Sequence, residues 1–543
     1  MQPKKKSPSK PQAVATVDYS KYFYWIGFAV IIFAFFPTYR YIYDEKVSVN
    51  EDNISYILLA KGIKSGVGYV DYNQVDQRPA NHFPPGYPFI LSILMFISED
   101  VQFLKMTSGL FFLGSLLLFY VLGKRMNVPW QVTLVASIFT LCNYHVASHG
   151  YETMSEMPFL FISLLSIFFL LKLTNEKPFY KNPIFYGLLA CVVLTYYIRA
   201  IGLSLLFGAL VYLWVELKNR KAAIALFAGF ILLALPWYFR GKVIDVPSGY
   251  ETQVTMINPY RPEMGKAGLK DFIDRIGKNT DRYLSREIPS AVVPSLVISY
   301  EKAVPKWLYA IGILSLLLAI AGMLYLKKYR WFILAYFIGL AGILALWPNV
   351  WFSTRFMMPF IPFLLLFIIF AFVKGVERIP NFPKAYAPWT ALLLLFFLNY
   401  YLKFDKAPDF ENQETAYPLE RANIESNNGY NPNWKNYFEV AEWAKKNLPA
   451  NSIVACRKPL LFHYFSGAST DYYPYDEDVD LFIENLAKTK AQYVVVDQLG
   501  FTSTSRYLVP AIQKKESLFE IIYTTEEPQT YLLKFKAPGS TTE

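Results

Sequence analysis

The sequence predicts a polytopic α-helical membrane protein with about eleven transmembrane helices and an extracytoplasmic α/β domain at its C-terminus. The first reason is composition: 54% of the 543 residues are hydrophobic and only 17% are charged, whereas soluble domains average about 25% charged residues. The second is aromatic content, since 45 Phe, 41 Tyr and 11 Trp are more than a soluble fold can bury. Three cysteines are too few for a disulfide framework, and no disulfide is expected.

A third observation is that apolar runs of about 17 to 25 residues, the length that spans a bilayer, recur along most of the chain. The first run is too long for a cleaved signal peptide, and bulky aromatic residues follow it instead of a small-residue cleavage site, so we expect it to remain as a helix. We predict eleven transmembrane helices, centred on residues 23–39, 103–122, 130–147, 157–171, 183–198, 201–217, 222–239, 307–326, 331–348, 356–373 and 386–402.

Lys and Arg residues in the short loops predict the orientation. With the N-terminus in the cytoplasm, the segments on that side hold 19 basic and four acidic residues, and eleven spans place the C-terminus outside. The net charge of +11 therefore reflects orientation, and no nucleic-acid partner is expected. A Lys-, Phe- and Tyr-rich composition suits a bacterial inner membrane, with the C-terminus in the periplasm.

The predicted organisation has three parts: a disordered cytoplasmic tail (residues 1–21), a transmembrane domain (22–403) and a periplasmic α/β domain (404–543). Two outer loops of the transmembrane domain, about 40–102 and 241–305, are too long to be simple connectors. In the C-terminal part, the helical stretch WKNYFEVAEWAKKNL alternates with the β-rich runs SIVAC, QYVVVD, LFEIIYTT and TYLLKF. This alternation is typical of a small α/β domain.

The first outer loop is where we expect chemistry. Ile54, Ile57 and Leu58 lie at helical spacing beside lysines, which predicts a short amphipathic helix in the membrane interface. The apolar run 85–97 is too short to span and predicts a second interfacial or re-entrant piece. These two elements would hold four charged or titratable residues at headgroup depth: Glu51, Asp52, Arg78 and His82.

Motifs in the chain resemble those of the GT-C glycosyltransferases, nearest to the protein O-mannosyltransferases and the lipid A aminoarabinose transferases (families 39 and 83). The resemblance covers nearly the whole membrane part and its topology. It rests on Asp52, Tyr56, Ala60, Gly68, Tyr69 and Pro84 to Pro88, and on SEMPF at 155–159, IRAIG at 198–202, LPWYFR at 235–240 and RFMMPFIP at 355–362.

This resemblance implies transfer of a sugar from a polyprenyl-phosphate carrier to an acceptor hydroxyl on the outer face, with membrane lipids around the site. The family's catalytic acid falls on Asp52, which would act as general base. In the family a glutamate often follows the aspartate; here Asn53 follows and Glu51 precedes, so Glu51 is the candidate helper carboxylate. The basic residue that the family tends to place before the proline turn is not clearly present, and His82 and Arg78 are the candidates to replace it.

Three arginines, Arg199, Arg240 and Arg355, lie on the outer side and break the positive-inside pattern. One interpretation is that they snorkel to lipid headgroups. The other is that they form a clamp for the donor phosphate, because guanidinium groups bind phosphate in a bidentate manner. We favour the clamp slightly for Arg355 and Arg240.

A further polar group stands between the third and fourth predicted helices. His145 and His149 are four residues apart, with Glu152 and Glu156 beyond them. Such a pair can bind zinc, but hydrogen-bonded interfacial histidines explain the spacing better, and we predict neither a metal nor a cofactor. Glu152, Glu156 and His149 form a possible second site, although Glu156 also fits as an acid at the start of a helix.

Two other function classes remain open. A secondary transporter would carry polar groups near the membrane midplane and helices broken at corresponding positions of two halves. A non-catalytic scaffold of envelope assembly would use the outer C-terminal domain as its binding module and would leave the Asp52 segment unexplained. For the glycosyltransferase, the acceptor can be an envelope lipid, glycan or protein.

Overall fold

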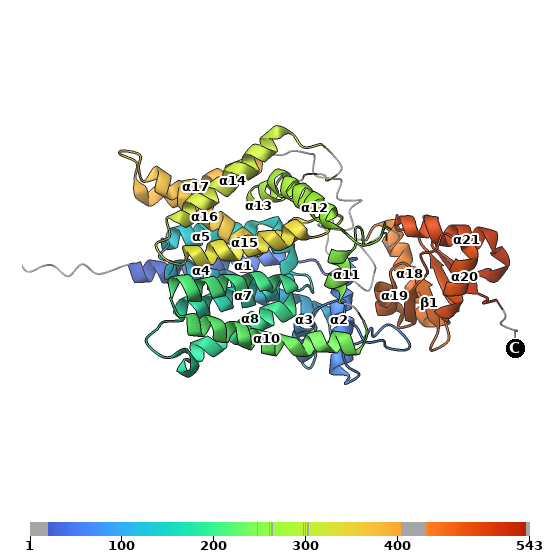
Figure 1. The fold of residues 1–543 in the computed structure, drawn as a ribbon. Coiled ribbons are helices and arrows are strands. Elements are labelled where there is room, and N and C mark those ends of the chain that lie inside the picture. The colour runs from blue at the N-terminus through green and yellow to red at the C-terminus, as the bar shows by residue number, and fades with distance from the viewer. Residues whose placement is uncertain are drawn as a thin grey trace, which may run out of the picture.

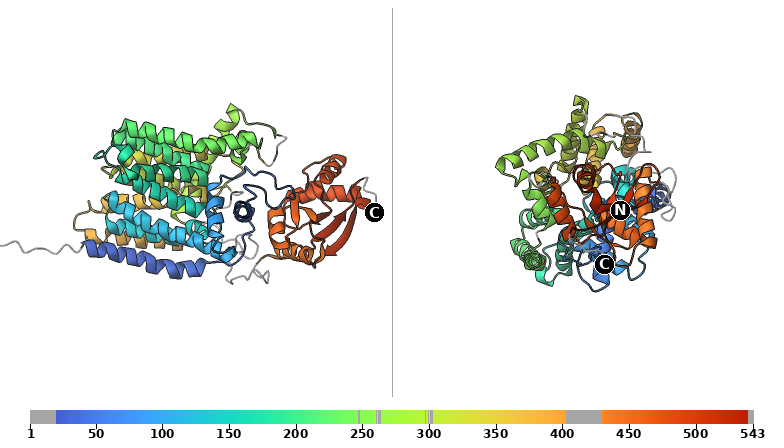
Figure 2. Two further views of the ribbon diagram at one scale, coloured as in Figure 1. Left: turned by 90° about the horizontal axis from the view of Figure 1, so that it is seen from below. Right: turned by 90° about the vertical axis from the view of Figure 1, so that its right-hand side faces the viewer.

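The computed structural model describes residues 20–538 apart from 247, 260, 262–263, 297, 299, 301–302 and 403–429. The tail predicted to be disordered lies almost wholly outside these residues. The described chain forms a bundle of helices with a mixed α/β domain at one end (Figure 1). Helix α1 begins at the end of the bundle remote from that domain, as the second view also shows (Figure 2). That the two termini lie on opposite sides of a membrane stays a prediction.

Each of the eleven predicted runs falls on a helix. Four of these helices, α1, α4, α10 and α14, are long and apolar enough to cross a membrane, and five further apolar helices are shorter; the count of eleven spans stays a prediction. The helices are α1 (Ser20–Ile42), α4 (Val101–Arg125), α5 (Trp130–Cys142), α7 (Glu156–Lys172), α8 (Pro183–Ile198), α9 (Leu203–Val211) with a π-helical turn (Tyr212–Glu216), α10 (Arg220–Val243), α14 (Lys306–Leu324), α15 (Arg330–Leu346), α16 (Ile361–Val376) and α17 (Ala387–Tyr401).

Short polar residues begin several of these helices. Asp100 accepts a hydrogen bond from the Phe103 amide at the start of α4, and Asn219 accepts one from the Ala222 amide at the start of α10. Asn and Asp are favoured at such positions because their side chains satisfy an amide that has no partner within the helix. The ends of the apolar runs are therefore encoded locally.

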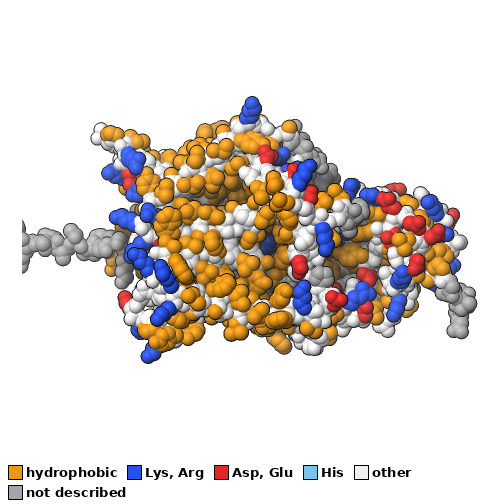
Figure 3. Space-filling view, viewed as in Figure 1, with side chains coloured by type: hydrophobic (Ala, Val, Ile, Leu, Met, Phe, Trp, Pro, Cys, Tyr) orange, Lys and Arg blue, Asp and Glu red, His pale blue; other side chains and the backbone are white. Residues whose placement is uncertain are grey.

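The surface of the bundle is largely apolar along its sides and charged toward its two ends (Figure 3). Large apolar side chains such as Phe33, Leu110, Leu232 and Leu393 are mostly exposed. Such a surface would be unfavourable in water, but it is expected where lipid surrounds the protein. In contrast, α7 and α16 are buried on nearly all sides and form the centre of the bundle.

The first outer loop contains α2 (Glu51–Lys64) and α3 (Gly86–Leu94). The helix predicted to lie in the membrane interface is present, but its apolar residues Ile54, Ile57 and Leu58 are buried within the protein. The reason is that α2 packs against α3 and against α19 of the C-terminal domain, a partner that the local pattern does not reveal. Helix α3 exposes Phe89 and Ile93, as an interfacial element should.

The second outer loop forms α11 (Gly249–Thr255), α12 (Leu269–Arg282), a π-helical turn (Tyr283–Glu287) and α13 (Ile288–Val292). The π-helical turn packs closely on α14. A Cβ atom at Gly312 of α14 would lie only 1.9 Å from the carbonyl oxygen of Leu284, so only glycine permits this approach.

The C-terminal domain is built on a five-stranded sheet in the order β2-β1-β3-β5-β4. Strand β1 is parallel to β2 and β3, whereas β5 is antiparallel to β3 and β4. The four predicted β-rich runs correspond to β1 (Ile453–Cys456), β3 (Tyr493–Val496), β4 (Phe519–Thr524) and β5 (Tyr531–Phe535), and the further elements are β2 (Ser469–Tyr472), α18 (Pro432–Asn447), α19 (Pro459–Ser466), α20 (Val479–Lys488) and α21 (Val509–Lys514). The short polar strand β2 carries no apolar alternation, so the sequence did not reveal it.

Several contacts join this domain to the first outer loop. The Tyr430 hydroxyl donates to the Val47 carbonyl at 2.8 Å. Asn73 Nδ2 donates to the Thr470 carbonyl at 3.1 Å, and the Thr470 amide donates back to the Asn73 carbonyl at 2.9 Å. The apolar core of the domain is continuous with residues of α2 and α3. The domain therefore covers one side of the first outer loop.

Candidate active site

A cavity of about 1040 Å³ lies at the end of the bundle next to the C-terminal domain, with residues of that domain in its wall. The segments that line it are far apart in the sequence. They come from residues 44–57, 83, 101–105, 144–156, 199–203, 250–254, 343–356 and 430–434. The first outer loop thus meets parts of the chain that the sequence does not place beside it.

Asp52 stands in this cavity wall, in the first turn of α2. The helix begins there because the Asn50 side chain accepts a hydrogen bond from the Asp52 amide at 3.2 Å. An acid in the first turn is also favoured by the helix dipole. One third of the Asp52 side chain is exposed, and its Oδ2 atom lies 3.4 Å from Arg355 Nη1. The carboxylate is therefore open to the cavity and faces a cation.

Arg355 belongs to a short 3₁₀ turn (Thr354–Met357). The turn is fixed by Ser353, whose hydroxyl accepts the Arg355 amide at 3.1 Å. Beside its contact with Asp52, the Arg355 Nε atom lies 3.5 Å from Glu156 Oε1. No hydrogen bond is made by this Nε atom within the described residues, although it is buried. The Nε atom therefore faces Glu156, while 23% of the Arg355 side chain stays exposed.

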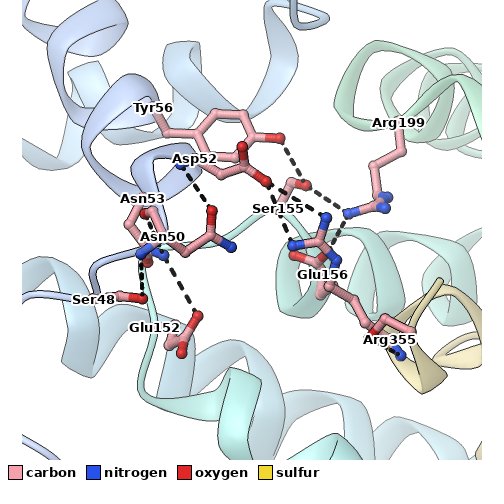
Figure 4. Close-up of polar contacts among 11 residues, drawn as sticks. Ser48, Asn50, Asp52, Asn53, Tyr56, Glu152, Ser155, Glu156, Arg199 and Arg355 are labelled. Atoms are coloured by element: carbon pink, nitrogen blue, oxygen red, sulfur yellow. Dashed lines mark hydrogen bonds and ion pairs between the residues drawn. The ribbon is translucent and has the colours of Figure 1, made fainter. Parts of the chain in front are cut away.

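Glu156 links Arg355 to a second arginine (Figure 4). Its Oε1 atom lies 2.5 Å from Arg199 Nη1, and its side chain is only 2% exposed. Arg199 follows the last residue of α8, and its Nη1 also donates to the Ser155 hydroxyl at 3.0 Å, which accepts from the Tyr56 hydroxyl at 3.1 Å. A buried carboxylate between two guanidinium groups fixes both of them.

Glu152 and the histidines line another part of the cavity. Glu152 Oε2 accepts from Asn53 Nδ2 at 3.5 Å, and burial raises the pKa of this carboxyl to about 7. Burial lowers the pKa of His149 to about 4, so this ring is neutral at pH 7. Among the residues that the structure describes, there is no group of three or more His, Cys, Asp and Glu able to hold a metal ion.

Glu51, the predicted helper carboxylate, does not line the cavity and turns toward the C-terminal domain. Its Oε2 atom lies 3.6 Å from Lys458 Nζ, and its Oε1 atom accepts the Leu460 amide at 3.3 Å. The Tyr472 hydroxyl is a further donor at 3.4 Å. Burial is the largest influence on its pKa, which is raised. The structure therefore separates Glu51 from Asp52.

The structure does not bring Arg240, Arg78 or His82 into the cavity wall. Arg240 donates to the carbonyl oxygens of Ala80 and Tyr69, both at 2.9 Å. Arg78 Nε lies 2.8 Å from Asp76 Oδ2. His82 Nε2 lies 2.9 Å from the Ser55 hydroxyl and His82 Nδ1 lies 3.6 Å from Asp71. These three residues hold the segment between α2 and α3 in shape.

Several residues that line the cavity were not predicted from the sequence, among them Lys105, Tyr250, Trp347, Trp351 and Tyr430. Lys105 on α4 is buried and donates to the backbone carbonyls of Asp44 and Lys46. A lone lysine inside an apolar run was the signal that would have found it. The aromatic residues gave no signal because the chain is rich in them throughout.

This architecture is similar to that of several solved structures. The chain is similar to the oligosaccharyltransferase AglB of Archaeoglobus fulgidus in complex with an inhibitory peptide and a dolichol-phosphate, with a TM-score of 0.54 and 12% identity over 97% of this chain and 76% of that one. It is also similar to ArnT of Cupriavidus metallidurans bound to undecaprenyl phosphate, with a TM-score of 0.54 and 10% identity over 96% of this chain and all of that one.

The chain has the GT-C fold. No family model matches the sequence, and no curated protein matches it. The likeness is thus one of architecture, at sequence identities of 10 to 12%. Within this GT-C fold the cavity is lined by residues of the helix bundle and by Tyr430, Asn431 and Trp434 of the C-terminal domain.

Proposed function

We propose that this protein is a membrane glycosyltransferase that moves a sugar from a polyprenyl-phosphate donor to an acceptor hydroxyl on the outer face. The observation that carries the proposal is the cavity in which the Asp52 carboxylate faces Arg355 at 3.4 Å, with Glu156 and Arg199 behind it. A base beside phosphate-binding cations is what this reaction needs. The solved GT-C structures bound to dolichol-phosphate and undecaprenyl phosphate support the choice of donor class.

In the proposed reaction Asp52 accepts the proton of the acceptor hydroxyl. The hydroxyl oxygen forms a bond to the anomeric carbon from the face opposite the phosphate. The bond between that carbon and the phosphate oxygen breaks, and its electron pair leaves with the lipid phosphate. Attack from the opposite face inverts the configuration at the anomeric carbon.

Charge balance in the cluster supports these roles. Two carboxylates, Asp52 and Glu156, face two guanidinium groups, Arg199 and Arg355. When Asp52 takes up the proton, one negative charge is neutralised and Arg355 is left with less compensation. At that moment the departing phosphate gains negative charge. The cluster therefore binds the transition state better than the ground state, which is the condition for catalysis.

The alternatives fit these contacts less well. A transporter would place its charged groups near the midplane, whereas this cluster stands at the outer ends of α2, α7 and α8. A non-catalytic scaffold gives no reason for a partly exposed carboxylate beside two partly buried arginines.

The proposal is tested with purified protein in lipid nanodiscs. Mass spectrometry of glycans and lipids from a deletion strain first identifies the product that is lost. The protein is then incubated with the matching polyprenyl-phosphate sugar and acceptor. We expect transfer with inversion at the anomeric carbon. The absence of any envelope glycan change in the deletion strain, together with no transfer by the purified protein, would refute the proposal.

A further inference from the structure

Helix α12 (Leu269–Arg282) packs on the protein with polar residues and exposes apolar residues at its surface. The side that packs inward is polar, and the side that faces outward includes an apolar edge. An amphipathic helix on a soluble protein shows the opposite arrangement. The buried residues, spaced by four and three positions, are Arg275, Asn279 and Arg282, and the exposed apolar residues, with the same spacing, are Leu269, Ile273 and Ile276.

The polar side of α12 binds the end of α15. Asn279, which is fully buried, donates from Nδ2 to the carbonyl oxygens of Leu344, Ala345 and Trp347 at 3.2, 2.9 and 2.8 Å. The last carbonyls of a helix have no partner within it. Asn279 therefore supplies the partners that α15 lacks at its C-terminal end.

Arg282 extends this contact along the following loop. Its Nη1 donates to the Asn349 carbonyl at 3.0 Å, and its Nη2 donates to Asn279 Oδ1 at 2.8 Å. The loop continues through Ser353, whose hydroxyl fixes the turn that carries Arg355. The position of Arg355 thus depends on a loop that Asn279 and Arg282 hold.

Arg275 reaches a second wall of the cavity. Its Nη1 donates to the Val254 carbonyl at 2.7 Å and its Nη2 donates to the Met256 carbonyl. Val254 belongs to α11, and both Val254 and Leu344 line the cavity. Helix α12 therefore joins two cavity walls from outside the cavity.

The depth of α12 relative to the membrane follows from its contact with α14. Helix α14 is apolar and long enough to cross a membrane. Asp281 near the end of α12 accepts the Tyr309 hydroxyl at 2.6 Å, and Tyr309 stands in the first turn of α14 beside Trp307. Tyr and Trp are enriched where a span leaves the hydrocarbon region. Seven of the 14 residues of α12 are charged, so it fits the interface and not the hydrocarbon core.

We propose that α12 lies in the interface of the outer leaflet with Leu269, Ile273 and Ile276 against the lipid acyl chains. Through Asn279 and Arg282 this contact sets the position of the Arg355 loop. The lipid contact stands independently, whereas the effect on Arg355 rests on the proposed function. Asn279 and Arg282 are positioning residues, and the partner of the apolar edge is the phospholipid of the leaflet.

The lipid contact is tested by spin labelling in phospholipid nanodiscs. After replacement of the three native cysteines, one variant carries a label at Ile273→Cys and the control carries it at Asp274→Cys. Asp274 is the neighbouring residue and its side chain is more than half exposed. We expect the label at 273 to collide preferentially with oxygen and the label at 274 with a water-soluble nickel complex. Equal exposure of both labels to the nickel complex would overturn the lipid contact.

The effect on Arg355 is tested by transfer kinetics. Ile273→Glu should raise the KM for the lipid donor several-fold, whereas the exposed control Lys278→Glu should not, and both should leave the KM for the acceptor unchanged. Arg282→Ala should raise the donor KM in the same way, and Arg282→Lys should restore part of the loss. A purely structural role would lower the yield of folded protein and leave both KM values unchanged, which would overturn the coupling. A wild-type protein without transfer activity would count against the proposed function and leave the spin-label result intact.

Discussion

Glu51 and Asp52 are neighbours at the start of α2, yet the two sides of this helix give them different surroundings. Asp52 faces the cavity, where Arg355 is its partner and one third of its side chain remains exposed. Glu51 faces the C-terminal domain, where Lys458, the Leu460 amide and the Tyr472 hydroxyl surround it. The comparison indicates that one carboxylate is available for chemistry and that the other joins two domains.

The largest effect is expected from breaking the cluster on the Asp52 side. Glu156→Gln removes the negative charge that Arg199 and Arg355 share. Loss of one partner of a buried ion pair costs about 3 kcal/mol or more, and misplaced guanidinium groups should lower transfer by about 100-fold. Thermal unfolding and transfer rates of the same preparation measure both effects. A variant with wild-type values in both assays would show that Glu156 does not hold the arginines.

A second test separates the cavity arginine from one that holds a loop. Arg355→Ala should lower transfer by about 10- to 100-fold, and Arg355→Lys should lose less because it keeps the charge. Arg240→Ala should instead lower the stability by about 1 to 2 kcal/mol, since it leaves the carbonyls of Ala80 and Tyr69 without their donor. Equal losses of activity in the two alanine variants would contradict this division.

A smaller effect is expected on the Glu51 side. Glu51→Gln keeps an acceptor for the Leu460 amide and removes a carboxylate whose pKa is raised by burial. Transfer should stay within about threefold of wild type, because the docking contacts largely remain. Steady-state transfer assays check this prediction. A loss as large as that of an Asp52 variant would make Glu51 part of the chemistry.

The smallest effect on transfer is expected for Glu152, another carboxyl of the cavity wall, and its test is the pH dependence of stability. Burial raises its pKa from 4.5 to about 7, so its ionisation opposes folding, and the associated stability is present below pH 4.5 and lost as the pH rises through 7. Glu152→Gln should therefore unfold at the same temperature as wild type near pH 4.5 and at a higher temperature at pH 8. Unfolding curves across this range test it, and an unchanged difference at all pH values would refute the buried, ionisable Glu152.

Sequence patterns predicted the helices and strands far better than they predicted which of these elements pack together. The eleven apolar runs and four of the five strands follow from local composition, because apolar length and alternation are properties of short segments. Asp52, Arg199, Arg355 and Glu156 were named from motifs, and the structure brings them together. Whether they act as proposed stays a prediction.

The surroundings that the sequence did not predict depend on long-range packing. Ile54 and Leu58 are covered by a domain that lies about 400 positions further along the chain, so a helix that is amphipathic by sequence becomes buried. Arg240 was predicted to bind phosphate because it was expected on the outer side of the membrane. In the structure its guanidinium group donates to carbonyl oxygens of the loop between α2 and α3. Neither outcome can be read from spacing, since each depends on where a distant segment folds.

The most direct test of the division between Asp52 and Glu51 compares Asp52→Asn with Glu51→Gln in one single-turnover experiment. Both variants are reconstituted in nanodiscs, and donor binding and the rate of sugar transfer are measured on the same samples. We predict that Asp52→Asn binds the polyprenyl-phosphate sugar like wild type but transfers it about 100-fold more slowly or worse, the usual contribution of a general base, while Glu51→Gln transfers at nearly the wild-type rate. Wild-type transfer by Asp52→Asn, or a greater loss in Glu51→Gln, would contradict the account.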